Sequence, residues 1–125
     1  MISLTSALKT LLIEKSLWLS EDQFKQLEIH HRLMNKWNKT HNLTRIVSED
    51  EAAEKHYLDS LMGLGWVPQE KTIHDFGSGA GFPGIVAAIA RPQQKVVLVE
   101  PARKRASFLE RTVKETGLAN VSVAN

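Results

Sequence analysis

The feature that most constrains the fold of this chain is a cluster of glycines directly after a short apolar segment. Residues 75–84 read Asp-Phe-Gly-Ser-Gly-Ala-Gly-Phe-Pro-Gly, and their first two residues end a strand candidate at residues 72–76. Glycine adopts positive φ without steric cost and lets a ligand approach the backbone, so this density predicts a tight turn at a binding site. Pro83 suits the first turn of a following helix, where its missing N–H costs nothing.

The segments after residue 70 alternate between strand and helix patterns. Strand candidates cover residues 72–76, 96–99 and 120–123, and helix candidates cover residues 83–91 and 102–116. The continuous apolar run Val-Val-Leu-Val at residues 96–99 predicts a strand buried on both faces of a parallel sheet. This order of elements predicts an α/β fold with right-handed crossovers and about three parallel strands.

The first half of the chain is predicted to be helical. One amphipathic helix covers residues 4–12, and a second begins at Ser20, where Ser-Glu-Asp-Gln fits a capping box. A third begins at Ser48 and ends at residues 63–65; its expected inward residues are Ala52, Ala53, Leu58, Leu61 and Met62. We therefore divide the chain into a helical segment, residues 1–70, and the first part of a Rossmann-like domain, residues 71–125.

Composition narrows the class of protein. The chain has 125 residues, of which 42% are hydrophobic and 24% charged, as expected of a soluble globular protein. It has no cysteine, which excludes disulfides, thiolate zinc sites and cysteine nucleophiles, and we find no pattern for a metal site. No apolar run approaches the ~20 residues of a membrane span, and the amino terminus lacks a signal-peptide cleavage site. We expect a cytoplasmic protein with no membrane partner.

Charge is distributed unevenly along the chain. The formal net charge is +2, yet no acidic residue occurs between Glu28 and Glu49, where Arg32, Lys36, Lys39 and Arg45 accompany Trp37. Cations with an aromatic residue suit a phosphate backbone. From this stretch alone we favour the simpler interpretation, a solvated helix face with Trp37 in the core.

An acidic residue ends each of the first two strand candidates. Glu100 lies at the predicted carboxyl edge of the sheet, where its carboxylate can accept both hydroxyls of a ribose, which argues for an adenosine-containing cofactor. Gly79 to Gly84 match the dinucleotide pattern G-x-G-x-x-G, with Glu100 sixteen residues beyond. Alternatively, Asp75 followed by alternate glycines matches the acid-first loop of S-adenosylmethionine enzymes.

Two features favour S-adenosylmethionine. Asp75 just before the first glycine gives a pyrophosphate no advantage, whereas a cationic sulfonium tolerates it. In addition, some seventy residues precede the first strand, whereas dinucleotide domains commonly begin with it. An NAD-dependent Rossmann oxidoreductase and a non-enzymatic RNA-binding module remain the alternatives, and a ligand-free glycine turn is the simplest structural explanation.

Several motifs together carry a family resemblance. They are Lys36-Trp37-Asn38-Lys39, Asn42-Leu43-Thr44, Lys55-His56-x-x-Asp59-Ser60, the glycine loop from Asp75 to Gly84, and Lys104-Arg105-x-x-Phe108-Leu109. In this order and spacing the chain resembles the ribosomal RNA small subunit methyltransferase G family, also called glucose-inhibited division protein B. The resemblance implies a Rossmann-like methyltransferase with an added amino-terminal helical part.

The resemblance also implies an activity and a site. The family uses S-adenosyl-L-methionine to methylate N7 of a guanine in the 16S RNA of the small ribosomal subunit. The implied cofactor-binding positions are Gly77, Phe82, Gly79, Gly81 and Glu100, to which we add the loop residues Asp75 and Ser78. Asn42 and His56 match family positions implicated in activity. Asp59 lies three residues after His56, on the same helix face, and we expect the two side chains to orient one another.

The implied chemistry agrees with the absence of a catalytic triad or carboxylate pair from the sequence. Guanine N7 has a free lone pair and no proton, so its attack on a methyl sulfonium needs no general base, and alignment supplies much of the acceleration. Members of the family are longer than this chain. We therefore expect a truncated chain with an unpaired edge on its central strand, weak cofactor binding, little or no activity and self-association through that edge.

Overall fold

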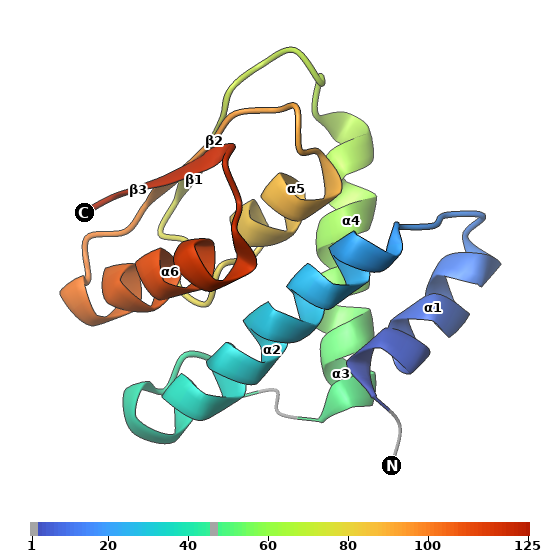
Figure 1. Ribbon diagram of the computed structural model, residues 1–125, viewed down its shortest axis with the longest axis horizontal. Coiled ribbons are helices and arrows are strands. Elements are labelled where there is room, and N and C mark those ends of the chain that lie inside the picture. The colour runs from blue at the N-terminus through green and yellow to red at the C-terminus, as the bar shows by residue number, and fades with distance from the viewer. Residues whose placement is uncertain (1–2, 46–47) are drawn as a thin grey trace.

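The computed structural model describes residues 3–45 and 48–125. Six segments of helix in the described residues lead into a three-stranded sheet with two crossover helices (Figure 1). In chain order the elements are α1 (Leu4–Glu14), α2 (Glu21–His41), α3 (Glu49–Ala52), the π-helical η1 (Ala53–Leu58), α4 (Asp59–Gly63), the 3₁₀ turn η2 (Leu64–Trp66), β1 (Ile73–Phe76), α5 (Gly84–Ala90), β2 (Val96–Val99), α6 (Arg103–Thr116) and β3 (Val121–Ala124). α3, η1 and α4 follow one another as one rod in Figure 1.

The sheet confirms the predicted α/β class. Its three strands are parallel in the order β1-β2-β3. Burial on both faces was a wrong prediction for β2, because Val96 and Leu98 are buried whereas Val97 and Val99 are only half-buried. The reason is that α5 and α6 both pack on one side of the sheet (Figure 1). Within the described residues β2 is paired on both sides, and β1 and β3 each have one unpaired edge.

The predicted start of α2 is confirmed in detail. The Ser20 hydroxyl accepts the Gln23 N–H at 3.1 Å, and the Gln23 side chain accepts the Ser20 N–H at 2.8 Å, which completes a capping box. The Gln23 amide also donates to the carbonyls of Ile89 and Ala90 at the end of α5. One side chain thus begins α2 and joins it to the sheet layer.

The rod between Ser48 and Gly63 departs from a regular α-helix. Residues Ala53–Leu58 form a π-helix, whose wider turn rotates the residues that follow it. The prediction that Met62 faces inward is therefore wrong, since this side chain is 44% exposed. Tyr57, in contrast, is fully buried.

The helical segment and the sheet share one hydrophobic core. Residues of α1, α2, η1, α5 and β2 belong to a single cluster; Leu8, Leu27, Tyr57, Ile85 and Leu98 are examples. Trp37 on α2 packs edge-on against Phe108 on α6 at 5.8 Å, which confirms the core placement that we favoured for it. Among the described residues, none of the helices is both long and apolar enough to cross a membrane.

Candidate functional site

The glycine loop leaves the carboxyl edge of the sheet in a conformation that requires glycine. Gly77, Gly79 and Gly81 have φ values of 73°, 57° and 101°. The Gly77 N–H donates to the Val99 carbonyl at 2.7 Å, which ties the start of the loop to β2. A Cβ on Gly77 would meet no atom within 4 Å, so this part of the loop faces open space.

Glu100 lies under the loop and holds part of it in place. One carboxylate oxygen accepts the Gly79 N–H at 2.8 Å, and the other accepts the Ala102 N–H at 2.9 Å. The residue is only 3% exposed. Because each carboxylate oxygen has two lone pairs, each retains one for a ligand hydroxyl.

Asp75 occupies the position where a dinucleotide domain would bind pyrophosphate. Its carboxylate accepts the Gly84 N–H at 3.1 Å, at the beginning of α5. Burial raises the pKa of Asp75, and the negative charge of Glu100 raises it further. A pyrophosphate at this helix end would meet a carboxylate already in place, which argues against the dinucleotide interpretation.

Ser78 has a structural partner inside the loop. Its hydroxyl donates to the Asp75 carbonyl at 2.9 Å, and the residue is 3% exposed. Gly81 is equally enclosed, because a Cβ there would lie 2.8 Å from the Ile85 side chain. These two positions shape the loop from within.

His56 joins two of the motifs identified in the sequence. Its ring stacks on Phe82 of the glycine loop, with centroids 4.3 Å apart and planes 12° apart. Its Nε2 and the Thr44 hydroxyl share a hydrogen bond of 2.9 Å. Partial burial lowers the pKa of His56, and the neighbouring His31 lowers it further, so the ring is neutral at neutral pH.

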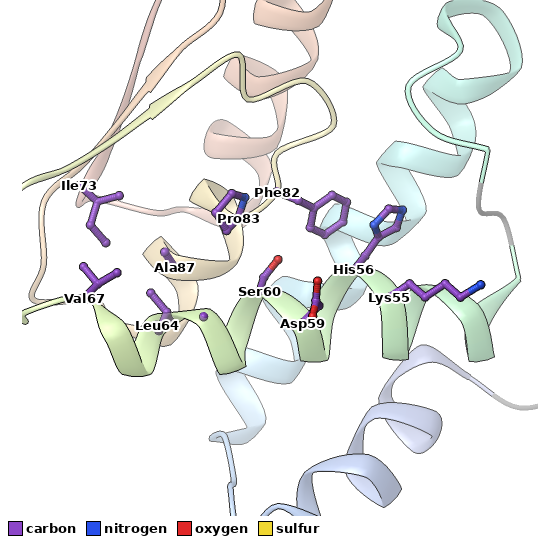
Figure 2. A pocket seen from close by; sticks show the side chains of 11 residues that line it. Lys55, His56, Asp59, Ser60, Leu64, Val67, Ile73, Phe82, Pro83 and Ala87 are labelled. Atoms are coloured by element: carbon purple, nitrogen blue, oxygen red, sulfur yellow. The ribbon is translucent and has the colours of Figure 1, made fainter.

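A cavity of about 400 Å³ lies beside this stack. Figure 2 shows His56 and Asp59 on the rod, facing Phe82 and Pro83 at the end of the glycine loop. Lys55 and Ser60 also line it, and Leu64, Val67, Ile73 and Ala87 form its apolar part. Charged and polar groups at one end and apolar walls at the other suit a planar, partly polar ligand.

The other two predicted catalytic residues, Asp59 and Asn42, make no hydrogen bond or ring contact with His56 within the described residues. Asp59 is exposed and lines the same cavity as His56, but the hydrogen-bond partner of His56 in the described part of the chain is Thr44 and not Asp59. Asn42 has φ of 49° and caps the end of α2 with its side chain exposed. The Asn38 side chain of the Lys-Trp-Asn-Lys motif accepts the Thr44 N–H at 2.9 Å, which helps to hold Thr44 near His56.

Sequence reasoning missed a buried pair behind the loop. The Tyr57 hydroxyl lies 2.6 Å from His30 Nδ1, and His30 Nε2 lies 2.7 Å from the Ala80 carbonyl. Nothing local in the sequence pairs His30 with residues so far along the chain. In residues 3–45 and 48–125, His, Asp and Glu side chains form no group of three that could hold a metal ion.

Comparison with known proteins places the chain in a family. The family model for GidB, rRNA small subunit methyltransferase G, matches residues 23–125. That match includes the glycine loop, His56 and the Asn-Leu-Thr motif. The chain belongs to this family.

Individual relatives extend the match to nearly the whole chain. A ribosomal RNA small subunit methyltransferase G of Wolinella succinogenes is 41% identical over 123 residues, which are 98% of this chain and 61% of the relative. The protein of the same name from Desulforamulus reducens is 40% identical over 97% of this chain and 51% of its own length. That from Nitrosomonas europaea is 50% identical over 91 residues, or 73% of this chain and 42% of the relative. The chain thus spans about half the length of the curated relatives that it matches.

Proposed function

We propose that this chain contributes the cofactor loop and part of the active site of an S-adenosylmethionine-dependent methyltransferase that modifies N7 of a guanine in 16S ribosomal RNA. The observation that carries the proposal is the contact chain Thr44–His56–Phe82. It brings together three motifs that are far apart in the sequence. Of these residues, His56 and Phe82 line a cavity that can accommodate a base (Figure 2).

The residues of the loop suit the proposed cofactor. S-adenosylmethionine would supply an electrophilic methyl group on a cationic sulfonium. Asp75 and Glu100 place carboxylates beside the glycines, in contact with Gly84 and Gly79, which favours a cation over a pyrophosphate. Gly77 and Gly79 would allow close approach to the backbone, Glu100 would accept ribose hydroxyls, and Phe82 would contact the cofactor on the side opposite His56.

The proposed reaction requires little acid–base catalysis by residues of this chain. Guanine N7 attacks through its own lone pair, so the site must hold the base in line and exclude competing orientations. His56 is neutral and fixed between Thr44 and Phe82, and it would position the base or its phosphate. Asp59 and Asn42 are proposed to assist from the rim of the cavity and from the end of α2.

The cofactor is tested by titration calorimetry with S-adenosylhomocysteine and, separately, with NADH. We expect binding of S-adenosylhomocysteine, strong weakening by Gly79→Val, and no binding of NADH. Gly65→Ala is the matched control, because a Cβ there meets no atom within 4 Å. NADH binding that depends on Glu100 would overturn the proposal in favour of an oxidoreductase.

The reaction is tested with labelled S-adenosylmethionine and 30S subunits that lack the modification, with the Wolinella succinogenes relative as positive control. We expect label on N7 of one guanine in 16S RNA, in far smaller amount than with the longer relative, and loss of this label in His56→Ala. Because no group must give up a proton, the rate should change little between about pH 6.5 and pH 8. Label on another atom, or a rate that rises steeply with pH, would contradict the proposed mechanism.

Further parts of the proposal concern organisation and partners. We propose that residues 1–70 serve mainly to hold RNA and the wall of the cavity, and residues 71–125 to hold the cofactor, in the cytoplasm. We also propose self-association through the outer edge of β1, which borders only β2 within the described residues. Sedimentation velocity over a range of concentrations tests this, and a strictly monomeric profile would exclude it.

A further inference from the structure

The glycine loop is held from behind by two side chains outside the motifs described above. His30 lies on α2 and Tyr57 on η1, and both are 0% exposed. His30 Nε2 lies 2.7 Å from the carbonyl of Ala80, which is 8% exposed and stands between two glycines of positive φ. The helical segment therefore contacts the loop between these two glycines.

These distances determine the protonation state of the pair. A backbone carbonyl is only an acceptor, so His30 Nε2 must carry the proton. Nδ1 is then an acceptor, and the Tyr57 hydroxyl donates to it at 2.6 Å. A histidine fixed as one tautomer by its second hydrogen bond has a defined ring orientation, and here this ring directs the donor at Ala80.

The hydrogen bond from His30 completes the restraint of one peptide group. The Gly81 N–H donates to the Ser78 carbonyl at 2.8 Å, so the Ala80–Gly81 peptide is held at both its N–H and its carbonyl. Space behind the loop is also filled, because a Cβ on Gly81 would lie 3.2 Å from His30 Nε2. Removal of the His30 donor would leave a buried carbonyl unpaired beside two glycines, and the loop would shift to satisfy it.

We infer that Tyr57 and His30 are positioning residues, which set the conformation of the glycine loop through the Ala80 carbonyl and thereby its affinity for the cofactor. The effect on affinity rests on the proposed function. The effect on loop conformation does not.

The first readout is the loop itself, without ligand. In ¹⁵N-resolved spectra we expect the His30 proton on Nε2, and a change in the amide resonances of Gly79 and Gly81 in Tyr57→Phe and His30→Leu. His30→Gln keeps a donor for the carbonyl and should restore both resonances toward their original positions. Tyr57→Phe keeps the ring and its packing, so it remains informative where His30→Leu fails to fold.

The second readout is the dissociation constant for S-adenosylhomocysteine. We expect Tyr57→Phe to weaken binding about three- to tenfold, the usual effect of removing one hydrogen bond. Gln94→Leu is the control, since Gln94 is buried and donates to the carbonyls of Pro68 and Lys71, away from the loop. It should lower stability and leave the affinity unchanged.

Three results would overturn the inference. They are a His30 proton on Nδ1, unchanged Gly79 and Gly81 resonances in folded Tyr57→Phe, or equal weakening by Gln94→Leu at equal loss of stability. If the unaltered chain binds no S-adenosylhomocysteine, the proposed function fails, and the amide resonances still decide whether the pair positions the loop.

Discussion

At the scale of single residues, Gly84 determines how closely α5 approaches the sheet. A Cβ at this position would overlap the Leu98 side chain of β2 and lie 2.7 Å from the Asp75 carboxylate. Since Leu98 is fully buried, it has no free space into which it can move. The last glycine of the loop is thus explained by helix–strand packing, whereas Gly77 and Gly79 are explained by backbone conformation.

We expect Gly84→Ala to destabilise the protein by about 1–3 kcal/mol, the range for overpacking a dense core. Urea unfolding followed by circular dichroism measures this. Gly65→Ala provides the comparison, because no atom lies within 4 Å of its added Cβ, and it should change stability by less than about 0.5 kcal/mol. Equal effects of the two variants would mean that α5 can move away from β2.

His30 gives the protein a defined dependence on pH. Burial lowers its pKa from 6.5 to about 4. Between these values the unfolded chain binds a proton that the folded chain does not, so stability falls as the pH drops through this window and is recovered above it. His56, whose pKa is also lowered, acts in the same direction, whereas the raised pKa of Asp75 opposes it at the acidic end.

We expect the unfolding free energy to fall by about 1 kcal/mol for each pH unit between about pH 6.5 and pH 4.5 on account of His30. The measurement is urea unfolding at several pH values in the original chain and in His30→Gln. The difference between the two slopes isolates His30 from the other groups. Parallel slopes would show that His30 is protonated in the folded protein.

At the scale of elements, the sequence predicted those features of the fold that residues close together in the chain determine. The glycine loop, the capping box at Ser20 and the position of each strand depend on residues close together in the chain. The π-helical turn at Ala53–Leu58 has no such signal, because neither glycine nor proline occurs in it and tertiary packing decides its form. Partners such as His30 and Ala80, fifty residues apart, are likewise set only by the fold.

The Gln23 side chain makes two kinds of hydrogen bond, one that caps α2 and one that joins α2 to α5. Its oxygen completes the capping box of α2, and its amide group donates to two carbonyls at the end of α5. We expect Gln23→Ala to cost more stability than Ser20→Ala, which should cost about 1 kcal/mol. Gln23→Glu keeps the capping box but turns an oxygen toward the two carbonyls, so it should be destabilising as well.

Thermal or urea unfolding of these three variants tests whether Gln23 joins the two helices. If Gln23→Glu is as stable as the original chain, the contact with α5 contributes nothing. If Ser20→Ala and Gln23→Ala are equally destabilised, the capping box alone accounts for the effect.

At the scale of the whole molecule, α2 and α6 together form one cationic face. We use this name for Arg32, Lys36, Lys39 and Arg111, all exposed; the first three are spaced to lie on one side of α2. Glu115 accepts from Arg111 at 2.7 Å and lies 3.8 Å from Arg32, and these cations with Lys36 lower the pKa of Glu115. The sequence indicated the α2 half of this face but not the Arg111 that α6 adds.

The two helices that carry the cationic face lead to the candidate site along the chain, because α2 ends just before Thr44 and α6 begins just after Glu100. We expect it to bind RNA phosphates. In the double variant Lys36→Gln/Lys39→Gln, the affinity for a labelled 16S RNA fragment should fall, and the slope of log K against log salt should decrease by about 0.7–0.9 for each phosphate that is no longer neutralised. The control variant Lys71→Gln/Lys95→Gln removes the same charge from exposed positions before the amino ends of β1 and β2, at the end of the sheet away from the glycine loop. The two double variants lose the same overall charge. An equal loss of affinity and slope in both would therefore show a general charge effect and contradict the prediction. A loss confined to the α2 variant would establish the cationic face as the RNA-binding surface.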